Sequence, residues 1–79
     1  MSAAPSHIVI IGLGLIGSSI ARAIKAHTPN VHISGVDQSD VSLVYARKHG
    51  FIDTASVDAR FTVQDADMVV IATPTSALE

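Results

Sequence analysis

The 79-residue chain contains no cysteine and no tryptophan, and it has only one tyrosine and two phenylalanines. The absence of cysteine excludes disulfides and thiol chemistry and is compatible with a reducing compartment, so we expect a cytoplasmic protein. So few aromatic side chains leave little surface for stacking on nucleic-acid bases. Five Lys and Arg residues against seven Asp and Glu give a net charge of −2. Because the basic residues are scattered along the chain, we expect no nucleic-acid partner.

Long hydrophobic runs are also missing. The main apolar run is short, contains three glycines and has no Lys or Arg before it, so it is neither a signal peptide nor a membrane span. We therefore expect no membrane partner. Hydrophobic residues make up 48% and charged residues 15% of the chain, which argues against disorder and, with the length, indicates one small domain. Residues 1–6 are expected to be a loose leader, and residues 78–79 are interpreted as vector-derived.

The chain is organised around the stretch IVIIGLGLIGS, from Ile8 to Ser18. Four β-branched aliphatic residues stop at a glycine, which is typical of a strand buried on both faces that enters a tight turn. The glycines fit the pattern G-x-G-x-x-G, and a helix is predicted from Leu15 to His27. Strand, glycine turn and helix form the context that a dinucleotide-binding motif requires. The predicted apolar face of the helix consists of Ile16, Ile20, Ala23, Ile24 and His27.

Each glycine has a distinct role in this interpretation. The first allows a sharp turn, the second lets a pyrophosphate approach the backbone, and the third lets the helix pack closely against the strand. Unpaired N–H groups at the helix start point at the phosphates, so no cationic side chain is needed. A P-loop is excluded because no G-K-[ST] follows, and the remaining alternative is a glycine-rich turn that binds nothing. The predicted cofactor contacts here are Gly12, Leu13, Gly14, Leu15, Ile16 and Gly17.

A second strand is predicted over residues 31–36 and ends at Asp37. This acid lies about 20 residues after Gly17, the offset at which a carboxylate binds the ribose hydroxyls of a dinucleotide. It would repel a 2′-phosphate, and no arginine stands beside it, so NAD is favoured over NADP. Gln38 and Ser39 follow and are included in the predicted site. A helix cap is the alternative role for Asp37, but Ser39 and Asp40 are better placed as caps.

The same signals predict the rest of the chain. A second helix spans residues 40–49, with solvated cations in its last turn and Gly50 as the residue that ends it, followed by a hydrophobic contact from Phe51. Residues 53–57 are a weak strand, and residues 58–65 form a helical turn or loop with Phe61 and Val63 as its apolar contacts. The run MVVIA, residues 68–72, predicts a central strand beside the first.

Polar residues near these elements give further expectations. Thr73 and Pro74 follow the last strand at the carboxyl end of the sheet, so they are predicted near the nicotinamide, although an ordinary proline turn is the alternative. Ser18 and Ser19 either reach a phosphate or pack locally. The aspartates are spread over separate loops and the four histidines have no recognisable catalytic spacing. We therefore predict no metal site and no catalytic residue in this chain.

These motifs resemble a known family. The segments GLGLIGSSIARAI (12–24), GVDQS (35–39), GFID (50–53) and VVIATP (69–74) are similar to the start of prephenate or arogenate (cyclohexadienyl) dehydrogenases. GLGLIGSS is the most specific part, and the resemblance covers residues 7–75. It implies an oxidoreductase of tyrosine biosynthesis that transfers a hydride from its small-molecule substrate to NAD(P) with loss of carbon dioxide. It also implies the pyrophosphate role of the glycines, the ribose role of Asp37 and the nicotinamide position of Thr73 and Pro74.

The fold implied is α/β: a partial Rossmann, or doubly wound, fold with a parallel sheet of about four strands in the order 3-2-1-4 and flanking helices. In that family a mostly helical domain follows the nucleotide-binding domain and builds the homodimer. The family's catalytic histidine and its substrate-binding arginines lie further along than residue 79, and none of the histidines here matches. We therefore expect residues 1–79 to be a truncated NAD(P)-binding domain that is inactive alone. Its fourth strand would form an exposed apolar edge, and the chain would self-associate or be marginally stable.

Three alternatives stay open. The chain could belong to another hydroxyacid or imine-reducing dehydrogenase, or to a non-catalytic NAD-sensing regulatory domain, since both share the strand, the glycine turn and the acid. The run LGLIGSS and the proline after the last strand favour an enzyme of the prephenate or arogenate dehydrogenase type over a sensor. A methyltransferase-like fold also pairs a glycine loop with an acid, but the third glycine, Gly17, disfavours it.

Overall fold

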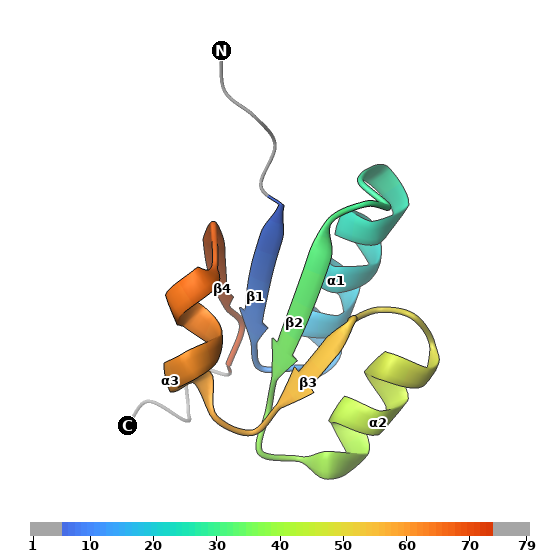
Figure 1. Cartoon of the computed structure of the whole chain (residues 1–79). Helices are drawn as coiled ribbons and strands as arrows, with labels where there is room; N and C mark the ends of the chain where they lie inside the picture. The colour runs from blue at the N-terminus through green and yellow to red at the C-terminus, as the bar shows by residue number, and fades with distance from the viewer. Residues whose placement is uncertain (1–5, 74–79) are drawn as a thin grey trace.

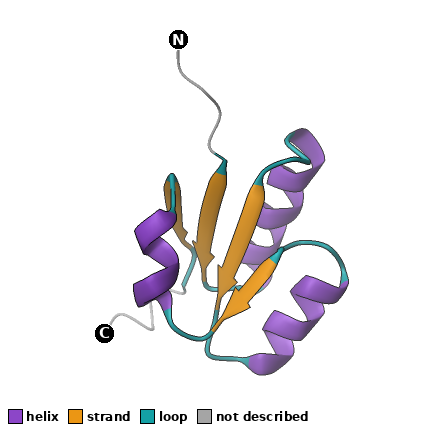
Figure 2. Cartoon of the chain, viewed as in Figure 1, coloured by secondary structure: helices purple, strands orange, loops and turns teal. Residues whose placement is uncertain are grey.

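The computed structural model describes residues 6–73 and, within that range, every side chain except that of Phe61. Its elements, in chain order, are β1 (His7–Ile11), α1 (Leu15–His27), β2 (His32–Val36), α2 (Asp40–Lys48), β3 (Thr54–Ser56), α3 (Ala59–Thr62), the 3₁₀ turn η1 (Val63–Asp65) and β4 (Met68–Ile71). The four strands form one parallel sheet in the order β3-β2-β1-β4, flanked by helices (Figures 1 and 2). The predicted strand order is confirmed.

The core lies between the sheet and the first two helices. Ile8 and Ile10 of β1 and Ile33 of β2 pack there with Leu43 and Ala46 of α2. Successive strand residues point to opposite faces of a sheet, so the intervening residues of β1 face the other side, where α3 lies (Figure 1). The valine between the two core isoleucines is fully buried on that side. The unbroken aliphatic run of β1 therefore reflects burial on both faces, as predicted.

Helix α1 has the predicted bounds, but it buries a different face. The predicted apolar stripe was wrong at three positions, because Ile16 is 67% exposed and Ala23 and His27 are also exposed. The physical reason is close packing: small side chains let the helix approach the sheet, which turns Ile16 outward. The residues of α1 that are buried or pack against the core are Gly17, Ile20, Ala21 and Ile24.

Helix α2 ends at Lys48, one residue earlier than predicted, and Gly50 follows it in the expected role. Gly50 has a positive φ of 76°, and its N–H donates to the Arg47 carbonyl at 3.1 Å. The Phe51 N–H donates to the Ala46 carbonyl at 2.8 Å. These two hydrogen bonds satisfy carbonyls of the last turn, and glycine reaches the left-handed conformation that they require without steric cost. Phe51 then packs against the core, so Gly50 has the predicted role.

The elements predicted for the second half of the chain are present, but they are shorter than predicted. The weak strand becomes the three-residue β3, and the predicted helical turn becomes α3 and η1. Strand β4 pairs with β1 and forms the edge of the described sheet, with Met68 46%, Val69 41% and Ile71 70% exposed. This is the exposed apolar edge that we expected. Residues 1–5 of the predicted leader lie outside the described residues, as do residues 74–79, which include Pro74 and the predicted vector-derived end. The leader prediction was wrong at Ser6, because its carbonyl accepts the His32 N–H at 2.9 Å and its N–H and hydroxyl donate to Asp67. Among residues 6–73, no helix has the length and apolar character to cross a membrane.

Candidate functional site

The turn after β1 requires two of its glycines for steric reasons. Gly12 has a φ of +96°, which side chains rarely adopt. A Cβ on Gly17 would overlap the Gly12 carbonyl oxygen, so a larger residue would push α1 away from the turn. In contrast, a Cβ on Gly14 would have no other heavy atom within 4 Å. The fold does not need glycine at position 14, and the backbone there faces space that a ligand can approach.

The start of α1 differs from the starts of the other two α-helices. The Ser39 hydroxyl accepts an N–H in the first turn of α2, and the Asp58 carboxylate does so in α3. Gly14 stands at the same position before α1, where no side chain makes a capping hydrogen bond. The first N–H groups of a helix have no partner within it and lie at the positive end of the helix dipole. In α1 these donors suit an anionic ligand.

Asp37 lies directly beside the glycine turn. Its Oδ2 accepts the Leu13 N–H at 2.7 Å, and its Oδ1 accepts the Ser39 N–H at 2.8 Å. The main-chain N–H of Asp37 donates to the Ser56 carbonyl of β3 at 3.2 Å. The hydroxyl of Ser39, not Asp37, caps α2. The predicted ribose acid and the predicted diphosphate turn are thus joined by a direct hydrogen bond.

A cavity of about 850 Å³ lies at the carboxyl ends of the parallel strands. Its described lining is mostly apolar, and Asp37 is the one charged side chain in it. Small-molecule sites commonly combine apolar walls with a few placed polar groups, and open α/β sheets bind ligands at this end. Seven predicted site residues line the cavity: Gly12, Gly14, Leu15, Ile16, Asp37, Gln38 and Thr73.

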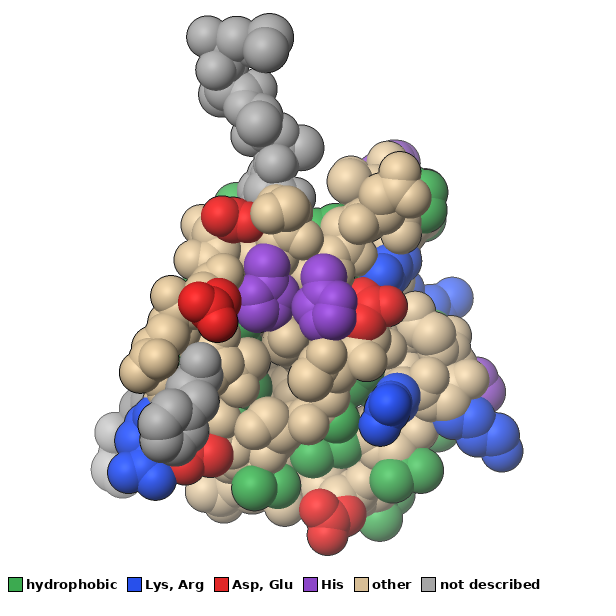
Figure 3. Space-filling model, viewed as in Figure 1, with side chains coloured by type: hydrophobic (Ala, Val, Ile, Leu, Met, Phe, Trp, Pro, Cys, Tyr) green, Lys and Arg blue, Asp and Glu red, His purple; other side chains and the backbone are tan. Residues whose placement is uncertain are grey.

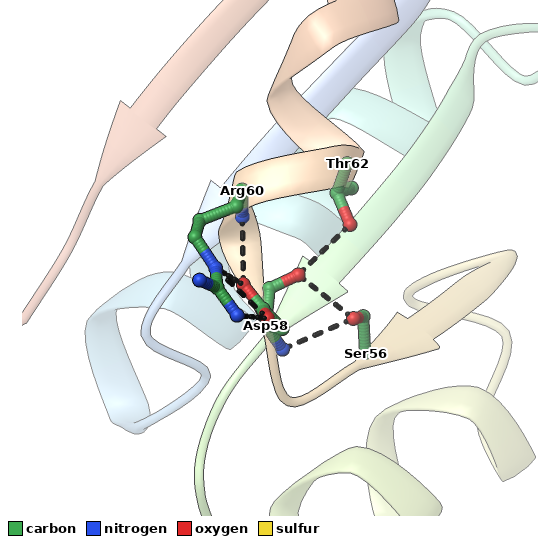
Figure 4. Close-up of polar contacts among 4 residues, drawn as sticks. All are labelled: Ser56, Asp58, Arg60 and Thr62. Carbon is green, nitrogen blue, oxygen red and sulfur yellow. Dashed lines mark hydrogen bonds and ion pairs between the residues drawn. The ribbon is translucent and has the colours of Figure 1, made fainter.

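The cavity wall formed by Val57 and Ala59 is supported by a hydrogen-bonded cluster (Figure 4). The Asp58 carboxylate accepts two contacts from Arg60 Nε at 3.1 Å and one from Nη2 at 2.7 Å. The Ser56 hydroxyl donates to the Asp58 carbonyl at 2.9 Å and accepts the Asp58 N–H at 3.1 Å. Hydrogen bonding from Arg60 lowers the pKa of Asp58 below its usual value. These contacts fix the turn between β3 and α3.

At the amino end of the sheet, two aspartates each make a reciprocal pair of hydrogen bonds with a neighbouring strand. The Asp67 N–H donates to the His7 carbonyl at 2.8 Å, and Asp67 Oδ2 accepts the His7 N–H at 2.8 Å. The Asp53 N–H donates to the Ile33 carbonyl at 2.7 Å, and Asp53 Oδ2 accepts the Ile33 N–H at 2.8 Å. Ser6 adds its N–H and its hydroxyl to Asp67 Oδ2. Each pair of hydrogen bonds joins the start of one strand to the neighbouring strand of the sheet.

The same contacts shift the pKa values of these two carboxyl groups. Partial burial raises the pKa of Asp53, but the Ile33 N–H and the ammonium of Lys25, 2.6 Å away, outweigh this effect and leave the pKa below its usual value. The hydroxyl of Ser6 and the main-chain N–H groups lower the pKa of Asp67. Both carboxylates are therefore held in their ionised form near neutral pH.

Two histidines lie side by side at this end of the sheet, between acidic side chains (Figure 3). His7 Nε2 is 2.7 Å from the Ser34 hydroxyl, and its Nδ1 is 3.2 Å from the Asp65 carbonyl. His32 Nε2 is 2.8 Å from the Thr54 hydroxyl, and the two rings are 5.1 Å apart. These imidazoles link strands. In the described part of the chain, no group of three His, Asp or Glu side chains is placed to hold a metal ion.

The family of the chain is decided by a match over most of its length. The family described as prephenate dehydrogenase, nucleotide-binding domain, matches residues 20–79. The chain belongs to this family. The resemblance found in the sequence motifs is thereby confirmed, although the matched segment begins inside α1, after the glycine turn.

Curated relatives of this family are much longer than the chain. The cyclohexadienyl dehydrogenase of Zymomonas mobilis is 44% identical over 72 residues, which are 91% of this chain and 25% of that protein. The prephenate dehydrogenase of Bacillus subtilis is 48% identical over 67 residues, 85% of this chain and 18% of that protein. The chain thus spans a quarter or less of the length of these two relatives.

Solved structures confirm a Rossmann-type dehydrogenase fold. The prephenate dehydrogenase from A. aeolicus, solved with hydroxyphenyl propionate and NAD+, superposes with a TM-score of 0.86 at 23% identity, over 99% of this chain and 28% of that one. The apo scyllo-inositol dehydrogenase from Lactobacillus casei superposes with a TM-score of 0.77 at 26% identity, over 95% of this chain and 23% of that one. The first match, below 25% identity, shows the fold alone.

Within this nucleotide-binding domain, three predicted site residues do not line the cavity. The side chain of Leu13 is 3% exposed and belongs to the core. Gly17 is buried under the turn, and Ser39 caps α2. Their contact with a cofactor stays a prediction, as does that of Pro74. The hydroxyls of Ser18 and Ser19 donate to main-chain carbonyls, at 3.0 and 2.8 Å, which favours the local-packing alternative for both.

The apolar half of the cavity wall was missed by sequence reasoning. One signal could have found most of it: in a parallel sheet, the residues that end each strand meet at the same edge. The last residues of β1 and β2 and the first residues after β3 and β4 satisfy this rule. The lining residues not predicted are Ile11, Val36, Val57, Ala59 and Ala72.

Proposed function

We propose that this chain is the NAD-binding part of a dehydrogenase that oxidatively decarboxylates prephenate or arogenate in tyrosine biosynthesis. One observation carries the proposal: the glycine turn, the uncapped start of α1 and the Asp37 carboxylate line a single cavity, in a chain of the prephenate dehydrogenase family. The names of the Zymomonas mobilis and Bacillus subtilis relatives support the reaction class. The NAD+ in the A. aeolicus enzyme supports the cofactor.

The described residues suit the two ends of the adenosine diphosphate. The free N–H groups at the start of α1 bind the diphosphate, and the bare Gly14 lets it approach the main chain. The Asp37 carboxylate accepts hydrogen bonds from the ribose hydroxyls and repels a 2′-phosphate, which favours NAD over NADP. Thr73 lies on the side of the cavity next to β4, where we place the nicotinamide. When bound, NAD supplies the hydride acceptor, and this chain positions it.

The remaining parts of the activity are assigned to a longer protein. Because the chain spans only 18–25% of the two relatives' lengths, we propose that further parts of a longer protein supply the substrate-binding and catalytic residues, and that a mostly helical domain supplies the homodimer contact. The 79-residue chain alone is then inactive.

Binding measurements test the proposed site. Titration calorimetry of the 79-residue chain with NAD, NADP and S-adenosylmethionine should give the tightest binding for NAD. Gly14→Ala should weaken NAD binding at least tenfold, because its methyl group occupies the approach to the diphosphate. The same variant should keep the melting temperature, since a Cβ there meets no neighbour. Tighter binding of S-adenosylmethionine, or unchanged NAD affinity in Gly14→Ala, would contradict the proposal.

The exposed β4 edge should make the isolated chain self-associate, because unpaired strand edges recruit other chains. We expect the mean mass in multi-angle light scattering to rise with protein concentration. Met68→Lys places a charge on this edge and should reduce the rise. A monodisperse monomer at every concentration, with a high melting temperature, would contradict this expectation.

A further inference from the structure

We propose that the Asp37 carboxylate has a second role beside binding ribose: it holds the glycine turn in the shape that receives the diphosphate, before and after the cofactor binds. This inference rests on the proposed NAD site and deepens it, because it makes Asp37 a positioning residue for the diphosphate as well as a contact for the sugar. The decisive contact is the 2.7 Å hydrogen bond from the Leu13 N–H to Asp37 Oδ2, which joins residues 24 apart in the chain.

The hydrogen bond continues the ladder between β1 and β2 past the ends of both strands. Ile11 pairs with Val36 in the parallel register. The Gly12 N–H then donates to the Val36 carbonyl at 2.7 Å. The next donor, the Leu13 N–H, goes to the side chain of Asp37. The carboxylate therefore replaces a main-chain acceptor at the point where the turn leaves the sheet.

Two other aspartates show that this fold uses the same device elsewhere. Asp53 and Asp67 each accept the main-chain N–H of a neighbouring strand at 2.8 Å, at the amino end of the sheet. Neither carboxylate lines the cavity, so both are explained by the sheet alone. Asp37 makes an equivalent contact at the carboxyl end. A role in holding the main chain is therefore expected of Asp37 on structural grounds, independently of any sugar.

The side chain and the carbonyl of Leu13 already have their own contacts. Its side chain is buried, and a Cβ on Gly35 would come within 2.7 Å of its Cδ1, so β2 is shaped to receive it. Its carbonyl accepts the Ser18 hydroxyl at 3.0 Å. With both groups fixed, the Leu13 N–H points at Asp37, and leaving a partly buried donor unpaired is unfavourable. Removal of the carboxylate should loosen the turn at Leu13.

The carboxylate has enough acceptor sites for both roles. An ionised carboxylate offers about four lone-pair sites. Two are used by the N–H groups of Leu13 and Ser39. Two remain, which is the number that two neighbouring ribose hydroxyls need. Cofactor binding therefore does not require Asp37 to release the turn.

Amide exchange tests this role without a cofactor. In Asp37→Asn the side chain keeps one acceptor oxygen and cannot hold both N–H groups. We expect the Leu13 amide, followed by NMR in the ligand-free chain, to exchange at least tenfold faster, and inorganic pyrophosphate to bind at least threefold more weakly. Asp40→Asn removes the same charge from the exposed first turn of α2 and should change neither. Unchanged Leu13 exchange and pyrophosphate affinity in Asp37→Asn, with NAD binding lost, would restrict Asp37 to the sugar and overturn the inference.

The unaltered chain provides a second measurement should Asp37→Asn fail to fold. Addition of NAD should leave the Leu13 amide at least as protected as in the free chain, because the turn stays held. Faster exchange on adding NAD would show that the carboxylate leaves the turn to bind ribose, and would overturn the inference. If NAD does not bind at all, the proposed function fails while the ligand-free exchange still decides the role of Asp37 in the turn.

Discussion

The two ends of the parallel sheet use similar residues for different purposes. At the amino end, Asp53 and Asp67 close strand starts onto their neighbours. Lys25 also bridges this end, since its ammonium contacts Asp53 and donates to the Val31 carbonyl at 2.7 Å. At the carboxyl end, Asp37 holds the turn through two N–H groups, yet it also faces a cavity. One end is closed by its own side chains, and the other keeps hydrogen-bonding capacity for a ligand.

This difference shows how a small domain separates stability from binding. Helices α2 and α3 start with capping side chains, whereas α1 starts with Gly14 and leaves its first N–H groups to the cavity. A capping side chain there would accept one of these N–H groups and so compete with the proposed anionic ligand. The domain thus lacks a small stabilising contact at the start of α1.

Gly17→Ala should have the largest effect, because it disrupts the carboxyl end where the main chain is closest. The new Cβ overlaps the Gly12 carbonyl oxygen, which cannot move as a side-chain end would. We expect a loss of about 3 kcal/mol in the free energy of unfolding, measured by urea denaturation. Gly14→Ala is the matched control and should lose less than about 0.5 kcal/mol. Equal losses in both variants would show that the turn is not close-packed as described.

Gly14→Asp, at the carboxyl end of the sheet, should weaken NAD binding while slightly raising the stability of the fold. Gly14 has an extended ψ of −160°, which suits a capping aspartate for α1. The new carboxylate should raise the free energy of unfolding by about 0.3 kcal/mol and repel the diphosphate, weakening NAD binding by about 100-fold. Calorimetry and urea denaturation of the same sample measure both quantities. Gly14→Asp with unchanged NAD affinity would show that the start of α1 does not receive the diphosphate.

Asp53→Asn should weaken the amino end without affecting the cavity. The amide cannot keep the charged hydrogen bonds to Ile33 and Lys25 at full strength. Because the side chain is partly exposed, we expect a loss of only about 1 kcal/mol in the free energy of unfolding, and no change in NAD affinity. Asp40→Asn is the control for the loss of charge. A drop in NAD affinity in Asp53→Asn would show that the two ends are coupled.

The smallest effect near neutral pH should be a dependence of stability on pH, to which the aspartates of the amino end contribute. The pKa values of Asp53 and Asp67 lie below the ordinary value of 3.8 in the folded chain. Their stabilising contribution is therefore complete above pH 3.8 and is lost as the pH falls through their lower folded-state values. Urea denaturation from pH 7 to pH 2.5 measures this loss. The double variant Asp53→Asn with Asp67→Asn should show a shallower decline, and an identical decline would exclude these groups as its source.

Local sequence signals predicted helix ends well, because these depend on the conformations of a few neighbouring residues. Gly50 ends α2 because its positive φ is a property of the backbone at that residue. The bounds of α1 were also predicted, since glycine precedes this helix and Thr28-Pro29 follows it. The wall residues Val57 and Ala59 were missed although β3 was predicted beside β2. The strand was predicted to run to residue 57, whereas β3 ends at Ser56, so the residues that follow it turn toward the cavity.

The sequence by itself determined that a strand enters a glycine turn and a helix, that an acid ends the second strand, and that the family is that of prephenate dehydrogenases. These features depend on residue type and short spacing. The tertiary structure decided which atoms meet: Asp37 with Leu13, 24 residues apart, and Asp67 with His7, 60 residues apart. The strand order was predicted, but such contacts also depend on strand register and side-chain geometry. These place distant residues within hydrogen-bonding distance, and no single stretch of chain carries them.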